Sequence, residues 1–229
     1  MAQKIPDGYC RFTVNYLVSQ IVRIDTNEAA HVGLLWRKGL KKTPPVTQYA
    51  AIGGGALLTA NGIYYINSIG AIFETEVLTD ARVFISKNRV IEAATRFRND
   101  PSLLTGGLLH ELRGELCGNE LGLGPIIPEA RLGEIEEVPL GWMVMAGSPI
   151  LRPTHDRVRE QDATSERLIQ GFELRVPSDM WDAMLAHQSI KRFTAEEVAR
   201  TEEGLVVATA DDGTTRIGNN MFLPNAFTP

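Results

Sequence analysis

The sequence has few cysteines and no long hydrophobic run. Its 229 residues include 2 cysteines, Cys10 and Cys117, which have neither a CxxC spacing nor a cysteine/histidine spacing. We expect both to be reduced, inert thiols, and a disulfide framework is excluded. No stretch approaches the roughly 20 apolar residues of a membrane span, and the N-terminus carries no apolar targeting segment. The sequence therefore predicts a cytoplasmic protein with no membrane partner.

The chain also lacks an excess of positive charge. It has 23 Lys and Arg residues against 28 Asp and Glu residues, a formal net charge of −5. No global positive field exists to attract nucleic acid or anionic lipid, so a nucleic-acid partner is not expected. Hydrophobic residues make up 44% of the chain, which is the usage of an ordinary globular protein and excludes the disordered and fibrous classes.

Hydrophobic periodicity and turn residues predict both strands and helices. We expect strands near 9–24, 30–36, 81–85, 135–138, 141–146 and 167–176, and helices over 61–70, 86–97, 105–118, 178–187 and 194–201. Residues 205–217 are typical of a hairpin. No internal repeat or flexible linker interrupts this pattern. The prediction is an α/β or α+β fold, with residues 1–190 as the main domain and 191–229 as a C-terminal extension made of a short helix and the hairpin.

One predicted helix carries a pair of carboxylates. Glu111 and Glu115 are four residues apart, which places both on one face beside a stripe that we expect to be buried. The stripe consists of Leu108, Leu109, Leu112 and Leu116, and Thr105 is the expected cap. Two like charges at this spacing repel, and a hard cation such as Mg²⁺ is a natural occupant. The alternative is an ordinary solvated helix face on which Arg113 reduces the repulsion.

The sequence around this pair resembles a known motif. His-Glu-Leu-Arg-Gly-Glu-Leu is similar to the Nudix helix, whose pattern is Arg-Glu-apolar-x-Glu-Glu-x-Gly, with Glu111 on its first Glu and Glu115 on its last. His110 stands where the family has Arg, Gly114 stands where it has the middle Glu, and the closing glycine is shifted to Gly118.

A wider pattern resembles one Nudix subgroup. Pro44-Pro45, the run Ile52-Gly53-Gly54-Gly55, the strand at Asp80-Ala81-Arg82 and then Glu-Leu-x-x-Glu-Leu are similar to the Nudix domains associated with bacterial nucleotidyltransferases of antiviral signalling operons. In that subgroup an insertion, here about 56–105, separates the glycines from the Nudix helix. The resemblance spans about 9–176 and implies a mixed β-sheet sandwiched between helices.

The resemblance also implies a function. A Nudix protein of this kind is a Mg²⁺-dependent pyrophosphohydrolase that cleaves a nucleoside diphosphate linked to another moiety, here in bacterial antiviral nucleotide signalling. Glu111 and Glu115 would be the catalytic ligands of Mg²⁺ or Mn²⁺. The expected substrate-binding residues are Gly53, Gly54, Gly55, Arg82 and Arg113. A homodimer is one option for its assembly.

Each of these roles has an alternative. The glycines are equally typical of a plain turn or bulge at a strand end, and Arg82 is typical of a structural ion pair with Asp80 or a neighbour. Gly114 leaves two carboxylates where the family has three, so further acids would have to come from elsewhere, for example Glu160, Glu166 or Glu173. The competing hypothesis is a catalytically degraded module that binds a nucleotide or a partner without turnover.

Overall fold

The computed structural model describes residues 5–38, 47–74, 78–118, 123–149, 164–194, 201–202, 207–209 and 215–218. They form helices and a large, mainly antiparallel sheet, so the fold is mixed α+β and the expected fold class is confirmed. No helix in these ranges is long and apolar enough to cross a membrane.

The chain divides into two compact units, each assembled from three stretches. The first unit comprises Met1–Tyr16, Gly54–Leu108 and Trp142–Gln170, and the second comprises Leu17–Gly53, Leu109–Gly141 and Gly171–Pro229. Three long strands contribute residues to both units, namely β1 (Tyr9–Arg23), β9 (Glu136–Pro149) and β10 (Thr164–Val176). The boundary expected at residue 190 stays a prediction.

In the first unit, the N-terminal half of β1 pairs antiparallel with β7 (Arg82–Ser86), so that Tyr9 lies opposite Ser86. β7 also pairs with β6 (Ile72–Phe73), and β1 pairs with β4 (Gly53–Gly55). A separate two-stranded sheet joins β5 (Leu57–Leu58) to β8 (Leu104–Thr105).

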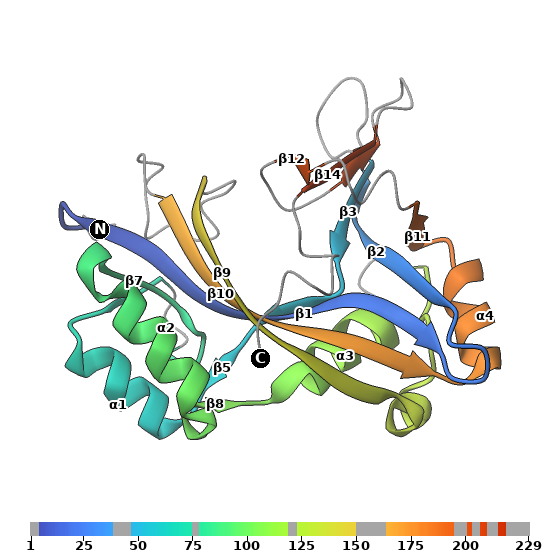
Figure 1. Ribbon diagram of the computed structural model, residues 1–229, viewed down its shortest axis with the longest axis horizontal. Coiled ribbons are helices and arrows are strands. Elements are labelled where there is room, and N and C mark those ends of the chain that lie inside the picture. The colour runs from blue at the N-terminus through green and yellow to red at the C-terminus, as the bar shows by residue number, and fades with distance from the viewer. Residues whose placement is uncertain are drawn as a thin grey trace. The chain divides into compact units, whose positions relative to one another are not determined.

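Two helices of the first unit cover one face of its sheet (Figure 1). α1 (Ala60–Ser68) begins where the Thr59 side chain accepts the N–H of Gly62, and α2 (Val90–Asn99) follows the short helix η1 (Lys87–Arg89). Phe97 on α2 stacks on Phe12 of β1 with ring centroids 6.2 Å apart and meets Tyr65 of α1 edge-on at 5.7 Å. Because successive strand residues alternate between faces, Arg11 and Thr13 lie on the face of β1 that points away from these helices.

In the second unit, β1 turns back into β2 (Ala29–Lys38), with Ile21 opposite Ala30. Asn27 takes the left-handed conformation in this turn, at φ 55°, which asparagine tolerates better than most residues. β2 pairs with β3 (Thr47–Ala51) and with β11 (Ile190–Phe193).

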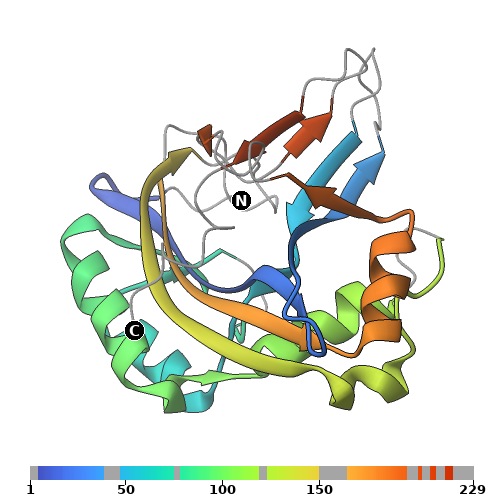
Figure 2. The ribbon, with the colours of Figure 1, turned by 45° about the vertical axis from the view of Figure 1, so that its right-hand side comes forward.

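The helices of the second unit bury apolar stripes. α3 (Gly107–Cys117) leads through η3 (Glu129–Glu134) to β9, and α4 (Ser178–Ala186) leads into β11 (Figure 2). Met180, Trp181 and Met184 of α4 are at most 3% exposed. Spacing at i, i+1 and i+4 therefore places one continuous face of α4 in the core.

The C-terminal strands extend the sheet of the second unit. β13 (Val207–Thr209) pairs antiparallel with β14 (Thr215–Gly218) and with β3, and β12 (Thr201–Glu202) pairs parallel with β14. The strand order is β12-β14-β13-β3-β2-β1-β10-β9. The pairing of β13 with β14 is the hairpin expected over 205–217, whereas most of the helix expected over 194–201 lies outside the described residues.

Some local expectations are wrong. The strands expected at 135–138 and 141–146 are one continuous strand, β9. Thr105 is not a cap, because it lies in β8 opposite Leu57, two residues before α3 begins. The glycine run is neither a loop nor a turn but the short strand β4.

Candidate functional site

The acidic pair lies at the edge of the buried face of α3. Leu108, Leu112 and Leu116 are at most 1% exposed, which confirms that this face of the helix is buried. Glu111 and Glu115, one turn apart, are half-buried. Leu109 was expected in the same stripe, but it is 41% exposed. The carboxylates therefore lie beside the leucines, as the 3.6-residue period requires.

A backbone contact joins the acidic pair to the glycine strand. The N–H of Gly53 donates to Glu115 Oε2 at 2.6 Å, although the two residues are 62 positions apart. Both belong to the second unit. A hydrogen bond to an ionised carboxylate is stronger than one between neutral groups and fixes the direction of the side chain. Two segments singled out separately in the sequence thus meet at one atom pair.

Gly53 has a backbone conformation that other residues avoid. Its φ is 130°, a region that L-residues rarely occupy. Gly54 and Gly55 belong to the first unit, and a Cβ at Gly55 would make only an ordinary contact, 3.7 Å from Asp80 Oδ1. The need for glycine is therefore clearest at Gly53, which presents its N–H to Glu115.

The two carboxylates suit a cation only in part. Within the described ranges, no group of three or more His, Cys, Asp or Glu residues is arranged to hold a metal ion. Mg²⁺ commonly takes one or two protein carboxylates and completes its octahedron with water and substrate phosphate. Glu111 and Glu115 fit that kind of open site and do not form a closed metal cage.

Of the further acids considered from the sequence, one lies in the second unit with the acidic pair. Glu173 accepts from Gln20 Nε2 at 2.6 Å and from Arg175 Nε at 2.8 Å, so it is engaged elsewhere in the second unit. Glu166 belongs to the first unit, and Glu160 lies outside the described residues.

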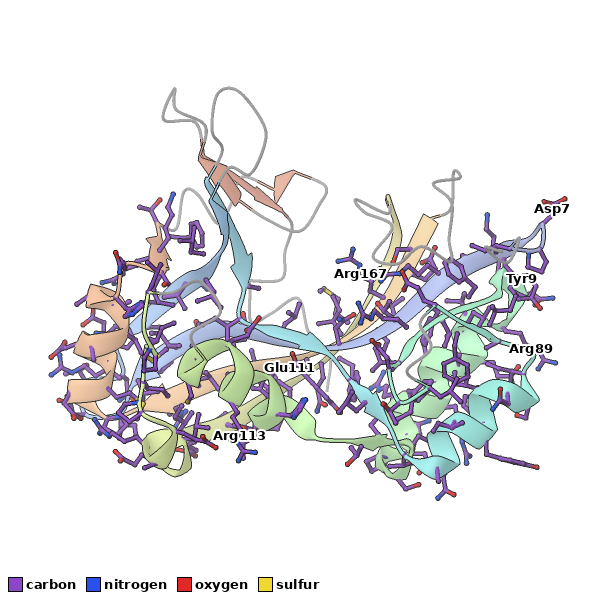
Figure 3. All side chains as sticks on the ribbon, turned by 180° about the vertical axis from the view of Figure 1, so that it is seen from behind. Asp7, Tyr9, Arg89, Glu111, Arg113 and Arg167 are labelled. Atoms are coloured by element: carbon purple, nitrogen blue, oxygen red, sulfur yellow. The ribbon has the colours of Figure 1, made fainter. Side chains whose placement is uncertain are left out.

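The two expected substrate arginines have carboxylate partners. Arg113 Nε lies 2.9 Å from Glu129 Oε1, and Arg113 points away from Glu111 toward η3 (Figure 3). Arg82, in the first unit, donates from Nε to Asp80 Oδ2 at 2.6 Å, the ion pair considered as its alternative role. The structure does not bring Arg113 to the carboxylates of Glu111 and Glu115, and a substrate role for either arginine stays a prediction.

The first unit contains a pocket that the sequence did not reveal. Its volume is about 380 Å³, and it is lined in part by Tyr16, Phe97 and Trp142, together with Arg98 and Gln170. Burial raises the pKa of the Tyr16 phenol, which therefore stays protonated at neutral pH. Aromatic walls with a cation and an amide suit a planar ligand. These five residues come from β1, α2, β9 and β10, so no local sequence motif indicates the pocket.

Both cysteines are free thiols. Cys10 is fully buried, and burial is the main cause that raises the pKa of each thiol. A raised pKa lowers the thiolate fraction, so neither cysteine has the environment of a nucleophile.

Comparison with known proteins gives no relative, since no family model, curated protein or solved structure matches this chain. A functional assignment therefore depends on the motif residues and on their placement in the fold.

Proposed function

We propose that this chain is a Nudix-type hydrolase that uses Mg²⁺ or Mn²⁺ to cleave a nucleoside diphosphate linked to another moiety. The observation that supports the proposal is the 2.6 Å contact between the Gly53 N–H and Glu115 Oε2. It brings together the glycine run and the carboxylate helix, the two segments that carry the resemblance to the family.

In this proposal Glu111 and Glu115 hold the cation against the diphosphate. The bound cation neutralises phosphate charge and makes a water molecule nucleophilic near neutral pH. Gly53 orients the Glu115 carboxylate through its N–H, and its lack of a side chain allows close approach of phosphate oxygens to its backbone. We place the protein in the cytoplasm, in the nucleotide signalling of bacterial antiviral defence, with a nucleotide-type small molecule as its partner.

A second function, binding without turnover, is favoured by two observations. Gly114 occupies the position of the family's middle carboxylate, and the described residues contain no third acid beside Glu111 and Glu115. The pocket of the first unit has the aromatic walls that suit a nucleobase. In this alternative the chain is a nucleotide-binding or interaction module.

The decisive variant is Glu115→Gln, which keeps the side-chain size and an oxygen for the Gly53 N–H but removes one negative charge. We expect Mg²⁺-dependent thermal stabilisation and hydrolysis to fall together. The metal-free variant should stay within about 1 kcal/mol of the parent protein, because relief of the like-charge pair is offset by a weaker hydrogen bond. Thermal melts with and without Mg²⁺ and phosphate-release assays on dinucleotides and nucleotide sugars measure both effects.

The matched control is Glu28→Gln, an exposed carboxylate of the second unit that pairs with Arg192. It should leave the Mg²⁺ response and the hydrolysis unchanged. If the parent protein shows neither a Mg²⁺-dependent melting shift nor turnover, with or without nucleotide, the hydrolase proposal is overturned in favour of the binding module.

Gly114→Glu separates the two functions from the opposite direction. A Cβ at Gly114 would meet nothing within 4 Å, so the larger side chain can be accommodated. The variant restores the family's middle carboxylate, and a hydrolase should gain Mg²⁺ affinity and turnover. A binding module should gain neither.

A further inference from the structure

Arg167 is a buried cation, and no ion pair joins it to a carboxylate in the part of the chain that the structure describes. It lies on β10 in the first unit (Figure 3), and it is 9% exposed. Its Nε atom is buried and has no hydrogen-bond partner among the residues that the structure describes. A buried guanidinium is normally paired with a carboxylate, because taking its charge out of water is costly.

Ser165, two positions earlier on β10, also has a buried polar atom with no hydrogen-bond partner among the described residues. Its side chain is fully buried, and within the described ranges its hydroxyl oxygen has no hydrogen-bond partner. Residues i and i+2 of a strand lie on the same face, so Ser165 and Arg167 present two unpartnered polar groups on one face of β10. Buried polar groups in native proteins are rarely left unpaired, and two adjacent exceptions require an explanation.

A second buried arginine on the neighbouring strand raises the positive charge around Arg167, and the carboxylate beside it pairs with that second arginine. Arg11, on the neighbouring strand β1, is 8% exposed and donates from Nε to Glu74 Oε2 at 2.8 Å. Glu74 is itself only 2% exposed. Among the described residues, the cluster therefore holds two buried guanidinium groups and the Glu74 carboxylate, which contacts Arg11.

Arg167 stays charged despite its burial. Desolvation, followed by the positive charge of Arg11, lowers the pKa of Arg167 to about 10. A guanidinium with that pKa is still protonated at neutral pH, so the positive charge cannot be removed by loss of a proton. Neutralisation requires an anion.

We propose that Arg167 and Ser165 form an oxyanion site in the first unit that binds a phosphoryl group. The guanidinium fork and the serine hydroxyl together offer more donors than the two oxygens of a carboxylate can serve, whereas a phosphoryl group presents three strong acceptor oxygens. Its negative charge also suits the net positive charge that remains after Glu74 has paired with Arg11. The site uses none of the residues of the acidic pair, so it stands whether or not the chain is a hydrolase.

The experiment measures thermal unfolding of the full chain in EDTA with increasing inorganic phosphate or pyrophosphate. The parent protein should show a saturable rise in melting temperature, because an anion that binds only the folded state stabilises it by mass action. Sodium chloride of equal ionic strength should not reproduce this rise, and acetate should give a smaller one.

Arg167→Met separates a ligand site from a structural role. If a ligand is the missing counter-ion, the variant should melt at the same or a higher temperature than the parent protein without phosphate, and it should lose the phosphate response. Ser165→Ala should weaken phosphate binding about 3- to 10-fold, the range for one hydrogen bond. Arg89→Met removes an exposed arginine of the same unit, paired with Glu92, and should leave the phosphate response intact.

Other outcomes overturn the proposal. A lower melting temperature of Arg167→Met without phosphate, with the phosphate response retained, would show that Arg167 has a counter-ion within the chain. An equal response to acetate would remove the preference for phosphoryl groups. If Arg167→Met does not fold, Arg167→Lys replaces it, since a point charge without the planar fork should bind phosphate more weakly. EDTA excludes the proposed metal site from this test, so failure here leaves the hydrolase proposal untouched.

Discussion

Arg131 Nη1 lies 2.6 Å from Asp179 Oδ2, an ion pair that joins η3 to the first turn of α4 within the second unit. The same guanidinium holds Glu134 through two contacts, of 2.9 Å from Nε and 2.6 Å from Nη2. These hydrogen bonds are the main cause that lowers the pKa of Asp179 and of Glu134. One arginine thus serves two carboxylates on separate elements.

This pairing predicts a pH-dependent effect of Arg131→Met. A carboxylate whose pKa is lower in the folded state stabilises the fold above its unfolded pKa, near 4, and loses that contribution as the pH falls. The difference in melting temperature between parent and variant should therefore be present at pH 7, shrink as the pH falls below the unfolded pKa, and vanish once the pH has fallen through the lower folded-state pKa of both carboxylates. The difference in melting temperature should be small, because these charged groups are largely exposed to solvent. Arg192→Met, which removes a single 3.2 Å contact with Glu28, should change the melting temperature less at pH 7.

Leu112 and Leu109 form a matched pair on α3. Leu112 is fully buried and Leu109 is 41% exposed. Leu112→Ala should lower the free energy of unfolding by about 2–5 kcal/mol, the cost of a core cavity, whereas Leu109→Ala should lower it by less than about 1 kcal/mol. Urea unfolding of both variants measures the difference, and equal losses would contradict the orientation of α3.

Gly62 allows α1 to pass close to η2 (Pro101–Leu103). A Cβ at this position would lie 2.2 Å from the backbone oxygen of Leu103, closer than any real contact. Gly62→Ala should destabilise the protein by about 1–3 kcal/mol, because a backbone atom must move. Gly114→Ala, with open space around its Cβ, should stabilise α3 by about 0.5–1 kcal/mol. Calorimetric melting temperatures should therefore shift in opposite directions.

Among the glycines of β4, Gly53 is the one with a backbone conformation that other residues avoid. Gly53→Ala should cost about 1–3 kcal/mol, since φ of 130° is strained for alanine, and should weaken the hold on Glu115. Gly55→Ala is the control, because φ there is not positive and its Cβ would make an ordinary contact. Denaturant midpoints report the strain, and a Mg²⁺-dependent melting shift reduced only in the Gly53 variant would link the backbone to the carboxylate.

The elements dominated by local periodicity could be predicted from the sequence. The i, i+4, i+8 spacing of Leu108, Leu112 and Leu116 identified both α3 and its buried face. Leu109 was misplaced because it lies 100° around the helix from Leu108, a step that a simple count of apolar residues ignores.

The helix ends were harder to predict because they depend on backbone conformation. Gly106 and Gly107, with φ of 84° and 54°, precede and open α3, so no capping side chain marks its start. α4 follows Pro177 at its cap position and begins at Ser178, whose hydroxyl accepts from Arg23 Nε at 3.2 Å. A serine before an apolar run cannot show whether its hydroxyl faces the helix or another element.

The clusters assembled by long-range pairing had no local signal. The positive charge of Arg11 acts on Arg167 only because β1 pairs with β10. Neither residue is unusual in its own segment. The contact between Gly53 and Glu115 had no local signal either, since nothing in the spacing of 62 residues requires it.

The interleaved path of the chain also constrains the order of events during synthesis. The first unit needs Gln170, and its three stretches alternate along the chain with those of the second unit, so no single cut of the polypeptide separates one unit from the other. A ribosome must deliver β10 before the first unit has all its strands, which favours folding late in translation over stepwise folding from the N-terminus. Premature termination before β10 should therefore leave the edge of β1 that pairs with β10 exposed, which makes the chain a substrate for chaperones and proteases.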